Sequence, residues 1–362
     1  MRPVLFLIAF ALLVSACGDV NSGESGSVVE GHITRVIETG QRPVPASERG
    51  AIFQRVEVQL DSSLYRGETA VIEWGGRRAL NAAGLLHEGD KVLLNVTRED
   101  RQRTYTIAEV GRLPALLPLS ALLVVTLLGI ARLAGLAALA GLAASVGVFL
   151  LAIVPALQRG DDPLVATVAG SVGVLVVAVF VIHGLGRKSV SALLGTLVGL
   201  VAVGGLGALA LSAARMSGFT GENEIFLSVA TDGRVDVARL ALAGVIVGSL
   251  GALVDMSVGQ ASTTFELAAA DPELRGRDLY LSALRVGRDH IGSLINTLAL
   301  AYFGGALPLV LLLSLNYQPL SVALNSEEMT LSILAVLVAS VGLVLCVPVT
   351  TAIAVTLARG RR

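Results

Sequence analysis

Residues 244–266 of this chain read GVIVGSLGALVDMSVGQASTTFE, and this stretch decides how the rest of the chain is interpreted. Small and polar residues recur in it at alternating steps of four and three, which is the spacing of one face of an α-helix. These positions hold Gly244, Gly248, Gly251, Asp255, Gly259, Ser262 and Glu266. The other positions are mostly Val, Ile, Leu, Ala and Met. The stretch therefore predicts an apolar helix with one small and polar stripe, and such stripes let helices approach closely in a membrane.

The two carboxylates on this stripe, Asp255 and Glu266, have two interpretations. A carboxylate within a membrane span is costly and commonly marks a substrate or ion pathway. Alternatively, the glycines serve helix packing and Asp255 lies at the cytoplasmic water interface, where acids of this kind also form structural pairs. Both interpretations stand at this point.

The composition favours an all-α transmembrane bundle of about seven helices. The chain has 362 residues, of which 54% are hydrophobic and only 15% are charged, against roughly 25% charged residues in a globular domain. Seven apolar runs are long enough to cross about 30 Å of hydrocarbon. They are Leu113–Ile130, Leu133–Val154, Leu164–Ile182, Val190–Ala213, Ala238–Met256, Ile291–Leu315 and Met329–Leu357. Small residues four apart, such as Gly195 and Gly199, predict tight packing between them.

The positive charges predict the orientation of these spans. With residues 28–112 outside, ten basic residues face the cytoplasm, namely Arg132, Arg187, Lys188, Arg275, Arg277, Arg285, Arg288, Arg359, Arg361 and Arg362. Four face outward, namely Arg159, Arg215, Arg234 and Arg239. This excess follows the positive-inside rule. We therefore expect a protein of the bacterial cytoplasmic membrane whose C-terminus lies in the cytoplasm.

The N-terminal residues 1–17, MRPVLFLIAFALLVSAC, predict a signal peptide of the lipoprotein type. Their apolar core is short for a spanning helix. It closes with Val14-Ser15-Ala16-Cys17, which resembles the bacterial lipobox, and Cys17 would be the lipidated residue. The alternative is an uncleaved N-terminal anchor. Residues 18–27 are a flexible polar tether.

Residues 28–112 predict an extracytoplasmic domain that folds as a small all-β, OB-like barrel. Five short runs with a period of two are separated by Gly, Asp, Asn and Pro. The clearest is residues 53–60, in which Phe53, Val56, Val58 and Leu60 are expected to face a core. The single tryptophan, Trp74, offers no aromatic platform for single-stranded nucleic acid, so we expect a structural or partner-docking module that binds no nucleic acid.

A second stripe follows an acidic-proline break at Asp271-Pro272. The inner amphipathic segment 257–290 ends in a helix predicted from Glu273 to His290, which runs into the sixth span. Its stripe holds Arg285, Asp289, Gly292 and Asn296, with Arg288 beside it. We expect the fifth and sixth spans to pack face to face through the two stripes. Asp255, Asn296 and one of Arg285 or Arg288 would then line a polar pocket at the inner leaflet, with Glu266 near its mouth.

These two motifs resemble the YibE/F family of bacterial multi-pass membrane proteins. The resemblance is carried by GALVDMSVGQASTTFEL and by ALRVGRDHIGSLINTLALAYFGGALPL, and it extends from Leu113 to the C-terminus. It departs from the family at residues 257–260, Ser-Val-Gly-Gln, where more aliphatic residues are expected. The resemblance implies a fold and a membrane location, and it implies no established biochemical activity.

No phosphate-binding Gly-Lys-Ser/Thr loop, His-Glu-x-x-His motif or Gly-x-Ser-x-Gly elbow occurs in the sequence. We therefore predict no enzyme activity, no cofactor and no metal site. The function expected first is that of a secondary transporter or permease, with the inner-leaflet polar site as its ion or substrate pathway. The alternative is a membrane scaffold that docks an extracytoplasmic protein partner. A transporter needs water to reach the acids, whereas a scaffold would hold them in salt bridges. The lipid bilayer is the expected partner of the helices. The sequence does not identify the extracytoplasmic protein partner, and it predicts no oligomeric state.

Overall fold

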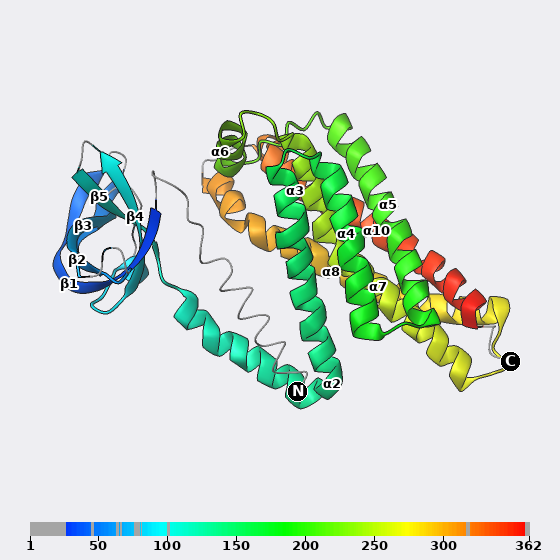
Figure 1. Ribbon diagram of the computed structural model, residues 1–362. Coiled ribbons are helices and arrows are strands. Elements are labelled where there is room, and N and C mark those ends of the chain that lie inside the picture. The colour runs from blue at the N-terminus through cyan, green and yellow to red at the C-terminus, as the bar shows by residue number, and fades with distance from the viewer. Residues whose placement is uncertain are drawn as a thin grey trace. The chain divides into compact units, whose positions relative to one another are not determined.

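The computed structural model describes residues 27–44, 47–62, 65, 67–75, 80, 82–99, 102–315 and 319–358. The predicted signal peptide, Cys17 and residues 18–26 of the tether lie outside these residues. The chain divides into two units between Ile130 and Ala131. The strands belong to the first unit and most of the helices to the second (Figure 1).

Within the described residues the first unit holds a five-stranded antiparallel barrel. The strands are β1 (Ser27–Val44), β2 (Ser47–Leu60), β3 (Thr69–Gly75), β4 (Lys91–Glu99) and β5 (Gln102–Val110). Their order in the sheet is β3-β2-β1-β4-β5, and β3 also contacts β5, which nearly closes the barrel. A short 3₁₀ helix, η1 (Ala82–Gly84), separates β3 from β4 in the sequence. The predicted OB-like barrel is confirmed.

The barrel core contains Val56, Val58 and Leu60, as predicted, but not Phe53. Side chains alternate between the two faces of a strand, so the fourth inward residue of this run is Gln54. Gln54 is buried because its amide is fully used: Oε1 accepts the backbone N–H of Leu86 at 2.7 Å, and Nε2 donates to the carbonyl of Leu86 at 3.2 Å. Phe53 lies instead beneath the guanidinium of Arg42, 4.5 Å from the ring centroid.

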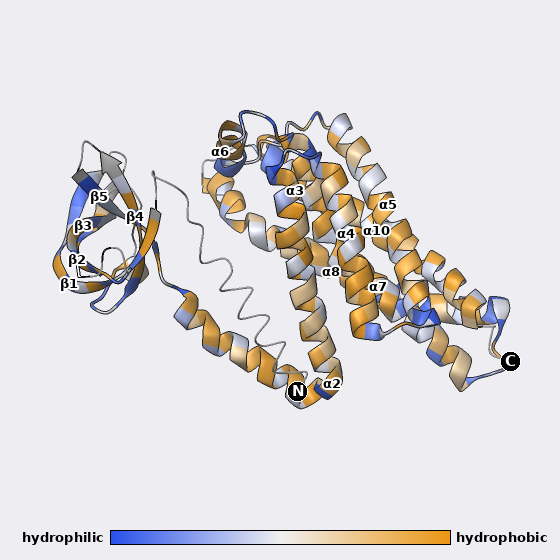
Figure 2. Cartoon of the chain, viewed as in Figure 1, coloured by the Kyte–Doolittle hydropathy of each residue, from blue (hydrophilic) through white to orange (hydrophobic). Residues whose placement is uncertain are grey.

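The helices begin directly after the barrel strands. They are α2 (Leu113–Val148), the π-helical turn η2 (Phe149–Ile153), α3 (Val154–Gln158), α4 (Pro163–His183), α5 (Arg187–Ala213), α6 (Glu222–Ala230), α7 (Val237–Ala270), α8 (Gly276–Leu315), α9 (Leu320–Leu324) and α10 (Glu327–Ala358). Six of the helical segments in the described residues are long and apolar enough to span a membrane. Apolar residues dominate the lengths of these helices, and polar residues gather at their ends (Figure 2). The chain is a multi-pass membrane protein.

The first of the six segments, Leu113–Gln158, accounts for the difference from the seven predicted spans. Its 46 residues would extend about 69 Å as a straight helix, more than twice the thickness of the hydrocarbon core. Arg132 interrupts it with non-helical backbone angles, φ 49° and ψ −120°. A break at this charged residue divides the segment into two lengths that each suffice for one crossing, in agreement with a bundle of about seven helices.

The core of the second unit forms where α5, α7 and α10 pack together. Ile246, Leu253 and Leu343 are completely buried there. The contact between α5 and α10 is close because it is made through glycines. A Cβ atom added to Gly342 would lie 2.5 Å from Val203 Cγ2 and 3.2 Å from the carbonyl oxygen of Gly199. The packing predicted from the Gly195 and Gly199 spacing is confirmed, since a Cβ at Gly195 would collide with Thr350 of α10.

Candidate functional site

The small and polar stripe of α7 lies on the exposed side of that helix. Gly244, Gly248, Gly251, Asp255, Gly259 and Glu266 are all exposed, and Ser262 is half-buried. The opposite side makes the helix contacts with Leu253 and Met256, and with the polar residues Ser257, Gln260 and Thr264. The 4-3 spacing of the stripe therefore marks a real face of α7, but it is not the face that packs against the bundle.

The stripe of α8 is also exposed. Arg285, Asp289, Gly292 and Asn296 all lie on the surface. The residues by which α8 contacts the bundle form a different face of the helix, with buried Leu279, Ala283, Gly287, Leu298 and Ala306.

Helices α7 and α8 do pack against each other, as predicted for the fifth and sixth spans, but not through the two stripes. Gln260 Nε2 donates to the carbonyl of Ala283 at 2.9 Å and to Thr351 Oγ1 of α10 at 2.7 Å. A Cβ at Gly287 would lie 2.5 Å from Gln260 Oε1. The small residues Ala283 and Gly287 thus decide which side of α8 meets α7.

Of the four glycines predicted to pack, Gly248 alone has a close neighbour among the described residues. A Cβ there would lie 2.5 Å from the hydroxyl oxygen of Tyr302 on α8, whereas Cβ atoms at Gly244, Gly251 and Gly292 would have no heavy atom within 4 Å. The small residues of the stripe mostly leave α7 open instead of closing it against a neighbour.

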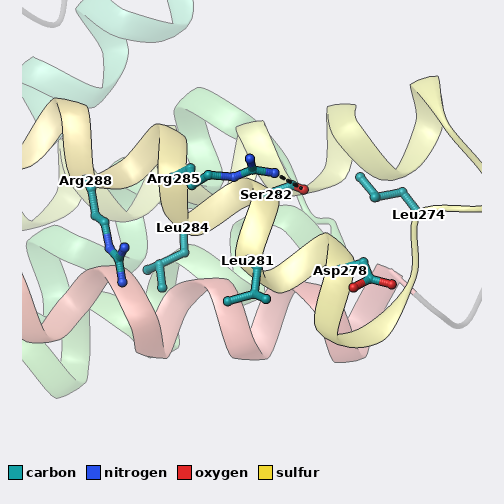
Figure 3. Close-up of a pocket in the computed structure, with 7 residues that line it drawn as sticks. All are labelled: Leu274, Asp278, Leu281, Ser282, Leu284, Arg285 and Arg288. Atoms are coloured by element: carbon teal, nitrogen blue, oxygen red, sulfur yellow. Dashed lines mark hydrogen bonds between the residues drawn. The ribbon is translucent and has the colours of Figure 1, made fainter.

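One cavity, of about 480 Å³, lies along the first half of α8 and contains both predicted arginines (Figure 3). Its lining is Leu274, Asp278, Leu281, Ser282, Leu284, Arg285 and Arg288. Arg285 runs along the helix and donates to Ser282 Oγ at 3.1 Å, while Arg288 points to a different side.

The predicted pocket shared between the two stripes is not this cavity, because Asp255, Asn296 and Glu266 do not line it. Asp255 makes no hydrogen bond or ion pair with any of the described residues, and neither Arg285 nor Arg288 is paired with an acid among them. Although α7 and α8 are neighbours, Asp255 is therefore not paired with Arg285 or Arg288 within the described chain.

A second cavity, of about 280 Å³, lies where α7 and α10 begin, and no pattern in the sequence predicted it. Its polar lining residues are Thr220, Glu224, Tyr302 and Ser332, and Gly244 belongs to it as well. These residues come from the segment before α6, from α6 itself and from three long helices. Glu224 lies in the short helix α6, about eighty residues before Tyr302, so no spacing in the sequence indicated that they meet.

The α7 stripe leads from this second cavity toward Asp255. Gly244 lines the cavity, and Gly248 touches Tyr302, which lines it too. Asp255 follows on the same face, eleven residues after Gly244, or about 16 Å along the helix axis. The arrangement is thus a cavity with one carboxylate, continued by an open glycine face that ends at a second carboxylate.

Comparison with known families gives one match. A family model described as YibE/F-like protein matches residues 119–360, which is most of the chain and includes both stripes and both cavities. Comparisons with curated proteins and with solved structures gave no match.

Proposed function

Since the chain belongs to the YibE/F-like family, a family of multi-pass membrane proteins, we propose that it is a secondary transporter or permease. In this proposal Asp255 is the ionisable group of the pathway, and the glycine face of α7 lines that pathway. The barrel lies outside the bacterial cytoplasmic membrane and the C-terminus lies in the cytoplasm, because that orientation leaves ten basic residues inside and four outside.

The observation that carries the proposal is the open environment of Asp255. A carboxylate held for structural reasons within a bundle is expected to be paired, because an unpaired charge in a membrane costs roughly 3 kcal/mol or more. Asp255 has no ion pair among the described residues and stands on an exposed glycine face. Within a span, a carboxylate without such a pair needs water or a bound ion beside it, which a transport pathway would supply. The scaffold alternative instead expects the acids to be sealed in salt bridges.

Uptake by proteoliposomes tests the proposal. We expect the purified protein to take up at least one member of a panel of inorganic ions and small metabolites, with or without a proton gradient. We expect Asp255→Asn to abolish that uptake and to leave the apparent Tm nearly unchanged, because no described partner loses its charge.

The matched control is Asp232→Asn, a change of the same chemistry in the exposed loop between α6 and α7, which should retain uptake. If Asp255→Asn lowers the Tm strongly and uptake falls only in proportion to folded protein, then Asp255 is structural. Absence of any uptake across the panel would favour the scaffold alternative.

A further inference from the structure

The cavity at the start of α7 and α10 combines an apolar wall with a few polar groups, which is the usual character of a small-ligand site. Val237, Leu240, Ala241 and Val245 of α7 and Leu331 and Ala335 of α10 supply the wall. The volume of about 280 Å³ suits a molecule of a few carbon atoms. These walls come from several elements, so the cavity is a built feature of the bundle and not a gap beside one helix.

The polar groups of this cavity are one carboxylate and three hydroxyls, those of Thr220, Tyr302 and Ser332. Glu224 contributes a carboxylate, and neither it nor the Tyr302 hydroxyl has a hydrogen-bond partner among the described residues. The hydroxyl of Ser332 already donates to the carbonyl of Glu328, at 3.0 Å, which leaves its lone pairs to face a ligand. Within this lining the Glu224 carboxylate is the charged group and can only accept hydrogen bonds, so the set favours a ligand that carries a positive charge.

The charge of the cavity is negative. Its lining holds one carboxylate and no basic side chain. The basic residue at the start of α7, Arg239, is engaged elsewhere: it pairs with Asp162, and its Nε lies 3.4 Å from Asp236 Oδ2. Arg239 is therefore not available to neutralise Glu224. The aromatic ring of Tyr302 adds a second surface that attracts a cation.

The position of Tyr302 depends on Gly248. Because a Cβ at residue 248 would lie 2.5 Å from the tyrosine hydroxyl oxygen, this hydroxyl can occupy its place only beside a glycine. The same glycine belongs to the open face that continues to Asp255. The cavity and the glycine face are thus joined at two places: at Gly244, which lines the cavity, and where Gly248 lies beside Tyr302.

We propose that this cavity binds a small organic cation, an ammonium group with a short apolar substituent, held by Glu224 and Tyr302. The proposal rests on the proposed transport function, for which it names the class of substrate. The ammonium group meets the carboxylate and the aromatic ring, and the carbon atoms meet the valine, leucine and alanine wall. In the orientation given above, the cavity opens at the outer end of the bundle, so the cation binds there before it reaches Asp255.

Binding to the full-length protein in lipid nanodiscs, measured by calorimetry, tests this inference. Choline is the first probe, and 3,3-dimethylbutan-1-ol is its neutral counterpart of nearly the same shape. Ethylammonium, putrescine and sodium complete the panel. We expect at least one ammonium compound to bind and its neutral counterpart not to bind.

Three variants locate the site. Glu224→Gln should weaken binding of the ammonium compound by at least about tenfold, because it removes the opposite charge. Tyr302→Phe should weaken binding less, because the ring remains. The matched control is Glu222→Gln on the same helix, which does not line the cavity and should leave the affinity unchanged.

Several results would overturn the inference: no ammonium compound binds, the neutral counterpart binds equally well, sodium alone binds, or Glu224→Gln binds like the control while its Tm is unchanged. The binding assay is separate from uptake. If binding is as expected but no uptake occurs, the transport function fails and the site stands. If uptake occurs without ammonium binding, the site fails and the transport function stands.

Discussion

At the scale of single residues, Asp162 ties the beginnings of two spans together. Its carboxylate caps α4 by accepting the backbone N–H groups of Leu164 and Val165, at 2.9 and 3.2 Å. The same carboxylate pairs with Arg239 in the first turn of α7. The hydrogen bond from Val165 does most to lower the pKa of Asp162, and the charge of Arg239 adds to it, against a smaller opposing effect of desolvation. The two backbone N–H groups and the guanidinium of Arg239 all stabilise the ionised form of the Asp162 carboxylate.

This lowered pKa predicts a stability that depends on pH. A carboxyl group with a folded-state pKa below its usual value stabilises the fold fully above that usual value, 3.8, and loses this contribution as the pH falls through the lower folded value. We expect Asp162→Asn, which keeps a cap but loses the charge, to lower the Tm by a few degrees at pH 6 to 7. Thermal unfolding at a series of pH values measures the difference from the wild type, which should shrink as the pH falls below 4.

Asp162→Ala removes the cap as well and should be less stable than Asp162→Asn at every pH. Because the site is exposed to solvent, high salt should reduce the effect of the charge. A difference between the wild type and Asp162→Asn that is the same at pH 7 and pH 3 would contradict the role of ionisation.

At the scale of elements, the crossing of α5 and α10 tolerates no added volume. Gly342→Ala would place a Cβ 2.5 Å from Val203 Cγ2 and 3.2 Å from a backbone oxygen, and overpacking of this kind costs about 1–3 kcal/mol. We expect a clear fall in the apparent Tm of the detergent-solubilised protein. The control is Gly205→Ala on α5, where a Cβ would meet nothing within 4 Å. That change should be neutral or stabilising, because alanine favours a helix over glycine by about 1 kcal/mol. Equal effects of both changes would argue against a close crossing.

The sequence predicted which elements exist more readily than which sides of them meet. Apolar runs of sufficient length, and the break at Asp271-Pro272 that follows the end of α7 at Ala270, placed the long helices well. Helix α8 begins at Gly276 and not at Glu273, a small error of the kind expected at helix ends. The period of two in residues 53–60 predicted a strand, although its inward face had to be read as Gln54, Val56, Val58 and Leu60.

The candidate site was predicted less well, for a reason particular to membranes. In water the apolar side of a helix is the side that packs, but in lipid both sides are apolar and shape decides. The glycine stripe of α7 therefore predicts the wrong packing side, because α7 packs through Leu253, Met256 and Gln260. A polar residue that bridges three helices, as Gln260 does, shows which side is buried better than the count of glycines does.

At the scale of the whole molecule, the number of membrane crossings decides on which side of the membrane the C-terminus lies. If Leu113–Gln158 crosses the membrane twice, turning at Arg132, the chain makes seven crossings and the C-terminus lies opposite the barrel. If it crosses once, both lie on the same side. We expect single-cysteine variants at Ser27 and Ser321 to react with a membrane-impermeant reagent from outside, and a variant at Gly360 to react only after the membrane is opened. Labelling of Ser27 and Gly360 from one side would exclude seven crossings.

The single tryptophan of the chain gives the barrel an optical signal of its own. Trp74 is buried in the barrel core, 7% exposed, and its indole N–H donates to the carbonyl of Gly84 at 3.0 Å. Because no other tryptophan is present, the wavelength of tryptophan emission reports only on the barrel, while the far-ultraviolet circular dichroism comes mostly from the spans. The two units can thus be followed separately in one unlabelled sample, and a denaturant titration read at both signals measures whether the barrel loses its fold before, with or after the helices.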